Sequence, residues 1–315
     1  MLEFTHVDVF AERPYSGNSL PVVWLTEHLS AGQMLAVTRE LRHFEAVFLE
    51  RTDDVTVARA RVFDLSEELP FAGHPLLGAA AALHAELGDR NHQTWTLLLK
   101  SRAVTVTTSP TTTGFRAWMD QGKPTFGNTV QQPEVVARAF SLARSDLDSR
   151  IPLEVVSTGL SYLIVPVESS ALARAKVAWD IGAMLAGFGA QFCVLLDEDN
   201  MEVRHWNNDG VLEDVATGSA AGTIGAYRLR HGLTEDGQEF SIRQGRFAGR
   251  PSELHVIARG SRNDVQGVSV GGSVVVMGGV PWRQFHDREE MVWASAKAAC
   301  SGFSEPPQEN GHSGV

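Results

Sequence analysis

Short segments in which hydrophobic or β-branched residues alternate with polar ones recur along most of this chain. A period of two is typical of strands that bury one face. The segments lie at 4–10, 20–25, 45–50, 55–63, 94–99, 103–108, 154–159, 161–167, 191–197, 201–206, 239–245, 253–260 and 272–279. The pattern therefore predicts a framework made mainly of strands.

A smaller number of segments have a helical period instead. They lie at about 31–41, 75–87, 133–145, 171–187, 218–231 and 288–300. Two of them, 75–87 and 218–231, are rich in alanine and glycine and are too small-sided and apolar to face water. We expect these two helices to be buried. The last residues, 303–315, have no period and are predicted to form a disordered tail.

The two apolar helices belong to an internal repeat. LPFAGHPLLGAAAALHAELG, from Leu69, aligns with DVATGSAAGTIGAYRLRHGL, from Asp214, so that Gly73 falls on Gly218 and His74 on Ser219. Residues 60–64 match 203–207, and residues 16–25 match 158–167, in the same order and at nearly the same offset. Matches of this kind indicate two homologous halves. The fold class is thus α/β (α+β), with two pseudo-symmetric halves, each a β-roll or barrel wrapped around a central helix.

The repeat also predicts the domain organisation. The first half is 1–120, closed by a strand and helix from about 265–302, and the second half is 121–264. If the halves face each other, the amino ends of both central helices point into one cleft. Their unpaired N–H groups and partial positive charge suit a small carboxylate. Alternatively, the small residues serve only to let sheet and helix pack closely, and both explanations can hold.

Composition narrows the functional classes. The chain has 315 residues, 43% of them hydrophobic and 21% charged, with 27 basic and 38 acidic residues and a net charge of −11. Without a basic cluster, nucleic acid is not expected as a partner. No apolar run is long enough to span a bilayer, and the start, MLEFTHVDVF, lacks the features of a signal peptide. We expect a cytoplasmic protein without a membrane partner.

Cysteine and histidine usage gives no sign of a cross-link or a metal. The two cysteines, Cys193 and Cys300, are too few for a disulfide framework in a chain of this length and are expected to be packing residues. The eleven histidines have no metal-ligand spacing. No metal is expected.

The repeat is informative where it breaks. Asp214 lies opposite Leu69, and Glu45 lies opposite approximately Gln191, so each carboxylate occurs in one half only. The architecture does not explain such an acid, which makes both candidates for chemistry. Alternation places Glu45 on the strand face opposite to that of its apolar neighbours. A solvent-facing acid is the alternative for this glutamate.

The segment EDVATGSAAG, residues 213–222, lacks the features of several known catalytic loops. It has no lysine of a phosphate-binding loop and no G-x-G-x-x-G, and Glu213 and Asp214 would repel a phosphate. Its serine is not framed as G-x-S-x-G, and His74 has no suitably placed nucleophile beside it in the sequence. These features disfavour nucleotide binding and serine-hydrolase chemistry.

The strand glutamate in ELRHFEAVF, together with ELPFAGHPLLG and EDVATGSAAG, resembles the PhzF-like isomerase family, which has the diaminopimelate-epimerase-like fold. The resemblance extends to about residue 280 and includes VDVFAERPYSGNSLPVV, VSTGLSYLIVPV, QGRFAGRPSEL and VSVGGSVVVMGG. It implies two α/β halves with an active site between them, and commonly a homodimer.

The resemblance also implies roles for single residues. Glu45 is the expected proton shuttle, and His74 and Asp214 are expected to assist it. The residues expected to bind the substrate are Gly73, Gly218, Ser219 and Asn18. Burial would raise the pKa of a carboxyl group that must accept and return a proton, and a neighbouring carboxylate would raise it further. Helix N–H groups would stabilise the charge that develops. No cofactor is expected.

Racemases of this fold use two cysteine thiols at the amino ends of the helices. The equivalent segments here, residues 72–75 and 216–219, contain no cysteine, so that mechanism is excluded. Three departures from the family pattern concern the substrate: Phe44 replaces the usual serine, Val215 replaces a proline, and Ser19 replaces another proline. They weaken an assignment to dihydro-hydroxyanthranilate itself and leave an aromatic or amino-acid-like carboxylate as the substrate class.

The sequence thus predicts a cofactor-independent isomerase that moves a proton on a small amino or hydroxy carboxylate. Two alternatives remain open. An amino-acid epimerase on the same fold would invert one stereocentre, and a non-catalytic homologue would bind a metabolite without converting it.

Overall fold

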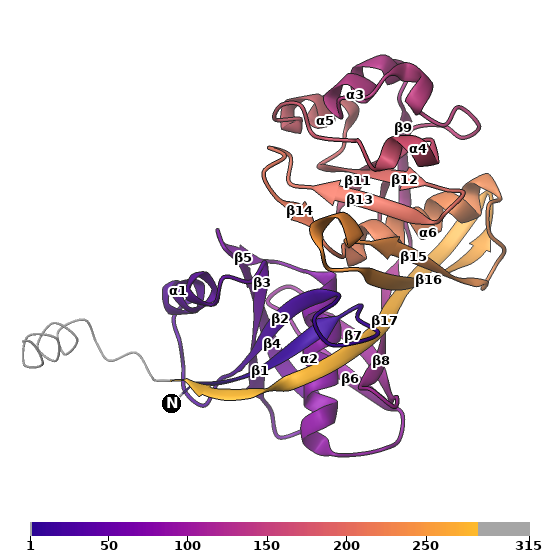
Figure 1. The fold of residues 1–315 in the computed structure, drawn as a ribbon. Coiled ribbons are helices and arrows are strands. Elements are labelled where there is room, and N and C mark those ends of the chain that lie inside the picture. Colours follow the sequence, from indigo (N-terminus) through magenta and orange to yellow (C-terminus); the bar gives the residue numbers. More distant parts are fainter. Residues whose placement is uncertain (1, 283–315) are drawn as a thin grey trace, which may run out of the picture.

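Eight strands close into a barrel that contains both ends of the described chain (Figure 1). The structure is a computed structural model that describes residues 2–282. In order around the barrel, the strands are β17 (Asp264–Trp282), β1 (Leu2–Val9), β2 (Asn18–Trp24), β3 (Glu45–Arg51), β4 (Val57–Asp64), β6 (Gln93–Leu98), β7 (Ala103–Pro110) and β8 (Phe115–Gly122), which pairs with β17 again. The β2–β3 and β4–β6 pairs are parallel and the others antiparallel.

Helix α2 (Gly73–Leu87) is enclosed by this barrel. Its first twelve residues are all buried, and it contacts strands around the whole ring. Alanine and glycine make the enclosure possible because they let the strands approach the helix backbone. The closest approach is at Gly78, where an added Cβ would lie 2.5 Å from Leu20 Cδ2 and 3.0 Å from the methyl groups of Val7 and Val9.

The second half repeats this arrangement around α6 (Gly218–His231). Its strands are β9 (Thr125–Thr129), β10 (Glu154–Ser157), β11 (Ser161–Pro166), β12 (Phe192–Asp197), β13 (Glu202–Trp206), β15 (Glu239–Gln244) and β16 (Ser252–Ser261), followed by the first part of β17. Here too the equivalent pairs, β11–β12 and β13–β15, are parallel. The short strands β5 (Glu68–Leu69) and β14 (Glu213–Asp214) are equivalent partners of β4 and β13. The predicted fold class is confirmed.

Strand β17 joins the halves. Its first residues pair with β16, its middle pairs with β8, and its last residues pair with β1. In Figure 1 it is the long yellow ribbon that runs between the two lobes. The domain limits 1–120 and 121–264 stay a prediction.

The smaller helices show where the periodicity misled. Helix α1 (Ala31–Leu41) has the predicted bounds, whereas the predicted helix 133–145 is reduced to α3 (Pro133–Ala139) and a 3-10 turn at Arg144–Asp146. A second 3-10 turn occupies Arg246–Ala248. The segment 171–187 contains two short helices, α4 (Ser169–Leu172) and α5 (Gly182–Phe188). Between them, the N–H groups of Lys176 and Ala178 donate to carbonyl groups at the end of α3. These N–H groups are therefore not used for helical hydrogen bonds, and the helix is interrupted here.

Strands β8 and β9 were not predicted. In β8 the inward positions are Ala117, Met119 and Gln121, and a buried polar Gln121 hides the alternation. Its amide donates to the carbonyl of Gly218 in α6 and its oxygen accepts from Thr158, which compensates its burial. The predicted helix 288–300, the tail 303–315 and Cys300 lie outside the described residues.

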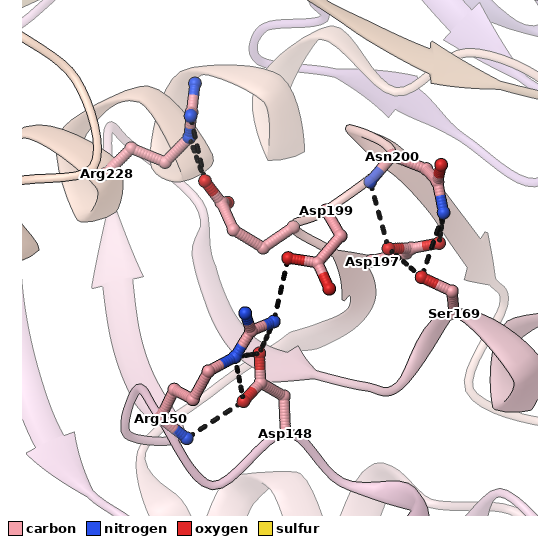
Figure 2. Close-up of polar contacts among 8 residues, drawn as sticks. Asp148, Arg150, Ser169, Asp197, Asp199, Asn200 and Arg228 are labelled. Carbon is pink, nitrogen blue, oxygen red and sulfur yellow. Dashed lines mark hydrogen bonds and ion pairs between the residues drawn. The ribbon is translucent and has the colours of Figure 1, made fainter.

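A polar network fixes the turn between β12 and β13 and with it the far end of α6 (Figure 2). Arg228, in the last turn of α6, donates to Glu198 at 2.9 Å. The other contacts join Arg150 to Asp148 and Asp199, and Asp197 to Ser169 and Asn200. Because the turn is tied to both α4 and α6, the axis of α6 is held at the end remote from its amino terminus.

Tight packing at Gly78 gives a stability prediction. Gly78→Ala should lower the free energy of unfolding by about 1–3 kcal/mol, because the added methyl would overpack the core against Leu20, Val7 and Val9. Helix propensity alone would favour alanine by about 1 kcal/mol. Urea denaturation measures the change. Gly32→Ala in α1 is the matched control, because nothing lies within 4 Å of its added Cβ, and it should stabilise. Stabilisation in both variants would refute the packing argument.

Candidate active site

Glu45 begins β3 and faces the inside of the first barrel. Val47, two residues on, lies in the core around α2, whereas Ala46 and Phe48 pack in a separate cluster with α1. The side chain of Glu45 is 19% exposed, and its Oε2 atom is buried without a hydrogen-bond partner. The solvent-facing alternative is therefore wrong, and an unpartnered buried oxygen marks the residue as a candidate for chemistry.

His74 lies directly against this oxygen. It is the second residue of α2 and is buried, and its Nδ1 is 3.5 Å from Glu45 Oε2. Its Nε2 atom is also buried without a partner. The start of the helix thus holds an imidazole beside the strand glutamate, with one polar atom of each still available to a ligand.

Asp214 ends β14 in the other half, and three hydrogen bonds hold its carboxylate. Oδ1 accepts from Asn18 Nδ2 at 3.1 Å and from the N–H of Ala216 at 3.3 Å, and Oδ2 accepts from Thr217 Oγ1 at 2.6 Å. Asn18 belongs to β2 and also donates to the carbonyl of Ala216. Asn18 of the first half thus holds the loop of the second half that carries Asp214.

The amino ends of α2 and α6 meet at their glycines. A Cβ added to Gly73 would lie 3.8 Å from the Cα of Gly218, and one added to Gly218 would lie 3.3 Å from the ring of Phe10. Neither helix has a side chain that caps its first turn. Two sets of helix N–H groups therefore converge on the place where Glu45, His74 and Asp214 come together.

The chain has relatives over nearly its whole length. It matches the family described as phenazine biosynthesis-like protein over residues 7–279. Trans-2,3-dihydro-3-hydroxyanthranilate isomerase of Pseudomonas aeruginosa is 33% identical over 292 residues, which cover 87% of this chain and 96% of the relative. The chain belongs to the phenazine biosynthesis-like family.

Further comparisons agree with that assignment. The uncharacterized isomerase YddE of Escherichia coli (strain K12) is 29% identical over 291 residues, or 88% of this chain and 97% of the relative. The solved structure of a predicted epimerase from Pseudomonas aeruginosa superposes with a TM-score of 0.84 at 46% identity and covers 90% of this chain and 100% of its own. The solved structure of a probable proline racemase from Agrobacterium radiobacter shows the same fold only, with a TM-score of 0.59 at 13% identity over 91% of this chain and 94% of its own. The protein is an isomerase of the phenazine biosynthesis-like family.

Burial and charge set the protonation of Glu45 and His74. Burial raises the pKa of Glu45 to about 8, with the negative charges of Asp214 and Asp64 adding to the shift. Burial lowers the pKa of His74 to about 4, although Asp214 opposes the change. At neutral pH the resting pair is therefore a protonated Glu45 beside a neutral His74.

The strand register corrects one detail of the repeat. Val22 pairs with Val47 across β2 and β3, and the equivalent Ile164 pairs with Val194 across β11 and β12. Glu45 is consequently equivalent to Phe192, not to Gln191. A shift of one residue moves a side chain to the other face of a strand. Asp214 is opposite Leu69 as predicted, since the two end equivalent strands.

Two polar residues of this family member escaped the sequence analysis. His205 pairs with Asp214 across β13 and β14 and is buried, and its Nδ1 donates to the carbonyl of Cys193 at 2.8 Å. The Tyr162 hydroxyl is 2.7 Å from Ser219 Oγ. In the aligned segments these residues are opposite Val62 and Leu20. The sequence carries a signal for both, since each is a polar residue aligned with an apolar one.

The departures from the family pattern lie close by. Phe44 precedes Glu45 and is half-buried, and Val215 is buried next to Asp214. The hydroxyl of Ser19 lies between two imidazoles, 2.6 Å from His6 Nε2 and 3.0 Å from His43 Nδ1. Ser19 follows Asn18 directly, so a proline there would remove this contact but not the one to Asp214.

The larger hollows among residues 2–282 lie away from this site. Hollows of about 380 and 370 Å³ lie elsewhere, one on the outer wall of β3 and β4 and one between Arg13 and Arg246, and neither includes Glu45, His74 or Asp214. In the same range no group of three or more metal-ligating side chains is placed to hold an ion. Nor does any described helix have the length and apolar character needed to cross a membrane. Homodimer formation and a cytoplasmic location stay predictions.

The raised pKa of Glu45 predicts a pH-dependent stability. An unfolded glutamate ionises above about pH 4.5, whereas folded Glu45 keeps its proton until about pH 8. The protein therefore loses stability, on the order of a few kcal/mol, as pH rises between these values. Glu45→Gln cannot ionise and should escape this loss. In urea denaturation, the variant's advantage should grow from pH 5 to pH 8. Glu50→Gln, exposed on the same strand, is the control, and a pH-independent difference for Glu45→Gln would contradict the burial argument.

Proposed function

We propose that this isomerase moves a proton between two carbons of a small amino or hydroxy carboxylate, with Glu45 as the acid and base and without a cofactor. The observation that supports this most is the buried, unpartnered Oε2 of Glu45 beside His74, at the junction of two helix amino ends. General acid–base catalysis works best with a residue whose pKa is near the working pH, and burial gives Glu45 such a pKa.

In this proposal ionised Glu45 removes a proton from one carbon of the substrate. The electrons of that C–H bond enter the adjacent π system as the proton moves to the carboxylate. Negative charge then develops on the substrate. The N–H groups of Gly218 and Ser219 have no acceptor within the helix, so they stay available to donate hydrogen bonds to this charge. Glu45 finally returns the proton to a second carbon, and the double bond moves accordingly.

His74 and Asp214 have supporting roles. His74 is neutral at neutral pH, so it can donate or accept a hydrogen bond at the substrate without adding charge. Asp214 makes Glu45 a stronger base by repelling its negative charge. Gly73 and Gly218 let the two helix ends come close, and Asn18 holds Asp214 in place.

A second function, epimerisation, is favoured by one observation. The second half holds its own carboxylate and imidazole: Asp214, whose negative charge acts on Glu45, and His205, its partner across the strands. Since Nδ1 of His205 donates to a carbonyl, its Nε2 carries the lone pair in the neutral ring. Inversion at one carbon needs a base on each face, and this pair would supply the second.

Isotope incorporation tests the proton transfer. The test substrate is trans-2,3-dihydro-3-hydroxyanthranilate, after which the Pseudomonas aeruginosa relative is named. Incubation with it in D₂O should place deuterium on a carbon of the product. Glu45→Gln should lower that rate by at least about 100-fold, because general acid–base groups contribute factors of that order. Mass spectrometry and NMR measure the label.

Glu50→Gln, on the exposed side of β3, is the matched control and should exchange at the wild-type rate. Undiminished exchange in Glu45→Gln would rule out the proposed role of Glu45. Chiral chromatography of the same product separates the two functions, since inversion at one centre without movement of a double bond indicates epimerisation.

The charge of Asp214 should be visible in the pH–rate profile. Because ionised Glu45 is the base, kcat/KM should rise with pH to a midpoint near 8. Asp214→Asn keeps the shape of the side chain but removes the negative charge that raises the pKa of Glu45. The midpoint should therefore move to lower pH, even if the maximal rate falls. A midpoint that stays or rises in Asp214→Asn would contradict the electrostatic role of this residue.

A further inference from the structure

Tyr162 belongs to the second half and contacts the first turn of α6. It lies on the inner face of β11, is 2% exposed, and directs its hydroxyl to Ser219 Oγ at 2.7 Å. The repeat makes it equivalent to Leu20 and makes Ser219 equivalent to His74. The first half therefore has an apolar side chain where the second half has a phenol, and the hydroxyl pair exists at one helix end only.

Hydrogen-bond chemistry decides which hydroxyl donates. Each group carries a single proton, so one of the two must be the acceptor. A phenol is more acidic than an aliphatic alcohol, which makes it the better donor, and burial raises the pKa of Tyr162 so that it keeps its proton. With Tyr162 donating, Ser219 Oγ is the acceptor, and the serine proton is free to donate elsewhere.

The backbone beside Ser219 is free to donate in the same way. Thr217 occupies the N-cap position of α6, but its hydroxyl donates to Asp214 Oδ2 and accepts from Gln244 Nε2. It consequently caps none of the helix N–H groups. The Ser219 hydroxyl is thus placed among first-turn N–H groups that no side chain satisfies.

We propose that Tyr162 is a positioning residue that orients the Ser219 hydroxyl, so that its proton and the first-turn N–H groups of α6 together bind the carboxylate of the substrate. This inference rests on the proposed function for the identity of the ligand. It adds a direction: the carboxylate binds to the second half, and the carbon that loses its proton lies toward Glu45 in the first half. Leu20 offers no comparable contact at α2.

Binding of a stable analogue tests the role of Tyr162. Anthranilate (2-aminobenzoate) keeps a carboxylate and an amine on a six-membered ring and cannot undergo the proposed shift because the ring is aromatic. Isothermal titration calorimetry should show that Tyr162→Phe weakens anthranilate binding roughly 3- to 10-fold, the effect of one neutral hydrogen bond. Ser219→Ala should weaken it roughly 10- to 100-fold, because a donor to a charged group is lost.

The double variant distinguishes positioning from direct contact. If Tyr162 acts only through Ser219, adding Tyr162→Phe to Ser219→Ala should change the affinity by less than about 2-fold, since the bond between them is already gone. Tyr227→Phe is the matched control. Tyr227 is also fully buried, and its hydroxyl donates to the carbonyl of Pro152, away from the site. It should lower the melting temperature without weakening anthranilate binding.

Three outcomes would overturn the inference: unchanged affinity in Tyr162→Phe, an equal loss from Tyr162→Phe in the Ser219→Ala background, or an equal loss in Tyr227→Phe. Failure of the wild-type protein to bind anthranilate at millimolar concentration would also overturn it. None of these results bears on Glu45, whose role is judged by deuterium incorporation. In that assay Tyr162→Phe should raise KM by a larger factor than it lowers kcat.

Discussion

The end-to-end contact of two buried helices at Gly73 and Gly218 determines where every polar group of the site lies. Each helix can be enclosed by strands only because alanine and glycine cover most of its surface. The same small residues let the amino ends meet, where a Cβ on Gly218 would press on Phe10. Close packing and exposure of free N–H groups are therefore one structural feature, and strands β3 and β14 bring the two acids to it.

The scaffold is symmetric, but its charges are not. Both halves present a positive helix end, yet Glu45 is in one half and Asp214 in the other, at positions that are not equivalent. Asp214 accepts three hydrogen bonds, which compensate the burial of its charge. Glu45 has no such bonds to Oε2, so it responds to burial by keeping its proton. Hydrogen bonds thus hold the carboxylate of Asp214, whereas Glu45 Oε2 accepts none.

The sequence predicted the parts of the fold that local periodicity determines. The bounds of α1 and α6 and the repeat follow from spacing along the chain, whereas alternation alone left the face of Glu45 open. Helix 171–187 failed because Lys176 and Ala178 bond to α3, a partner far away in the sequence. β8 was missed because Gln121 is buried against α6. Tyr162 and His205 could be found from the sequence, because in the aligned repeat each stands opposite an apolar residue.

The basicity of Glu45 is a property of the assembled junction. Burial and the charge of Asp214 are the two largest causes of its raised pKa, and both depend on the contact between the halves. Asn18 of the first half holds the carboxylate of Asp214, while Gln244 of the second half donates to the carbonyl of the same residue and binds Thr217. If the halves separated, the charge of Asp214 would move away from Glu45, and water would reach the Glu45 carboxyl group. Glu45 would then return toward the pKa of an ordinary glutamate, so the acid–base group is tuned only while the two helix ends remain in contact.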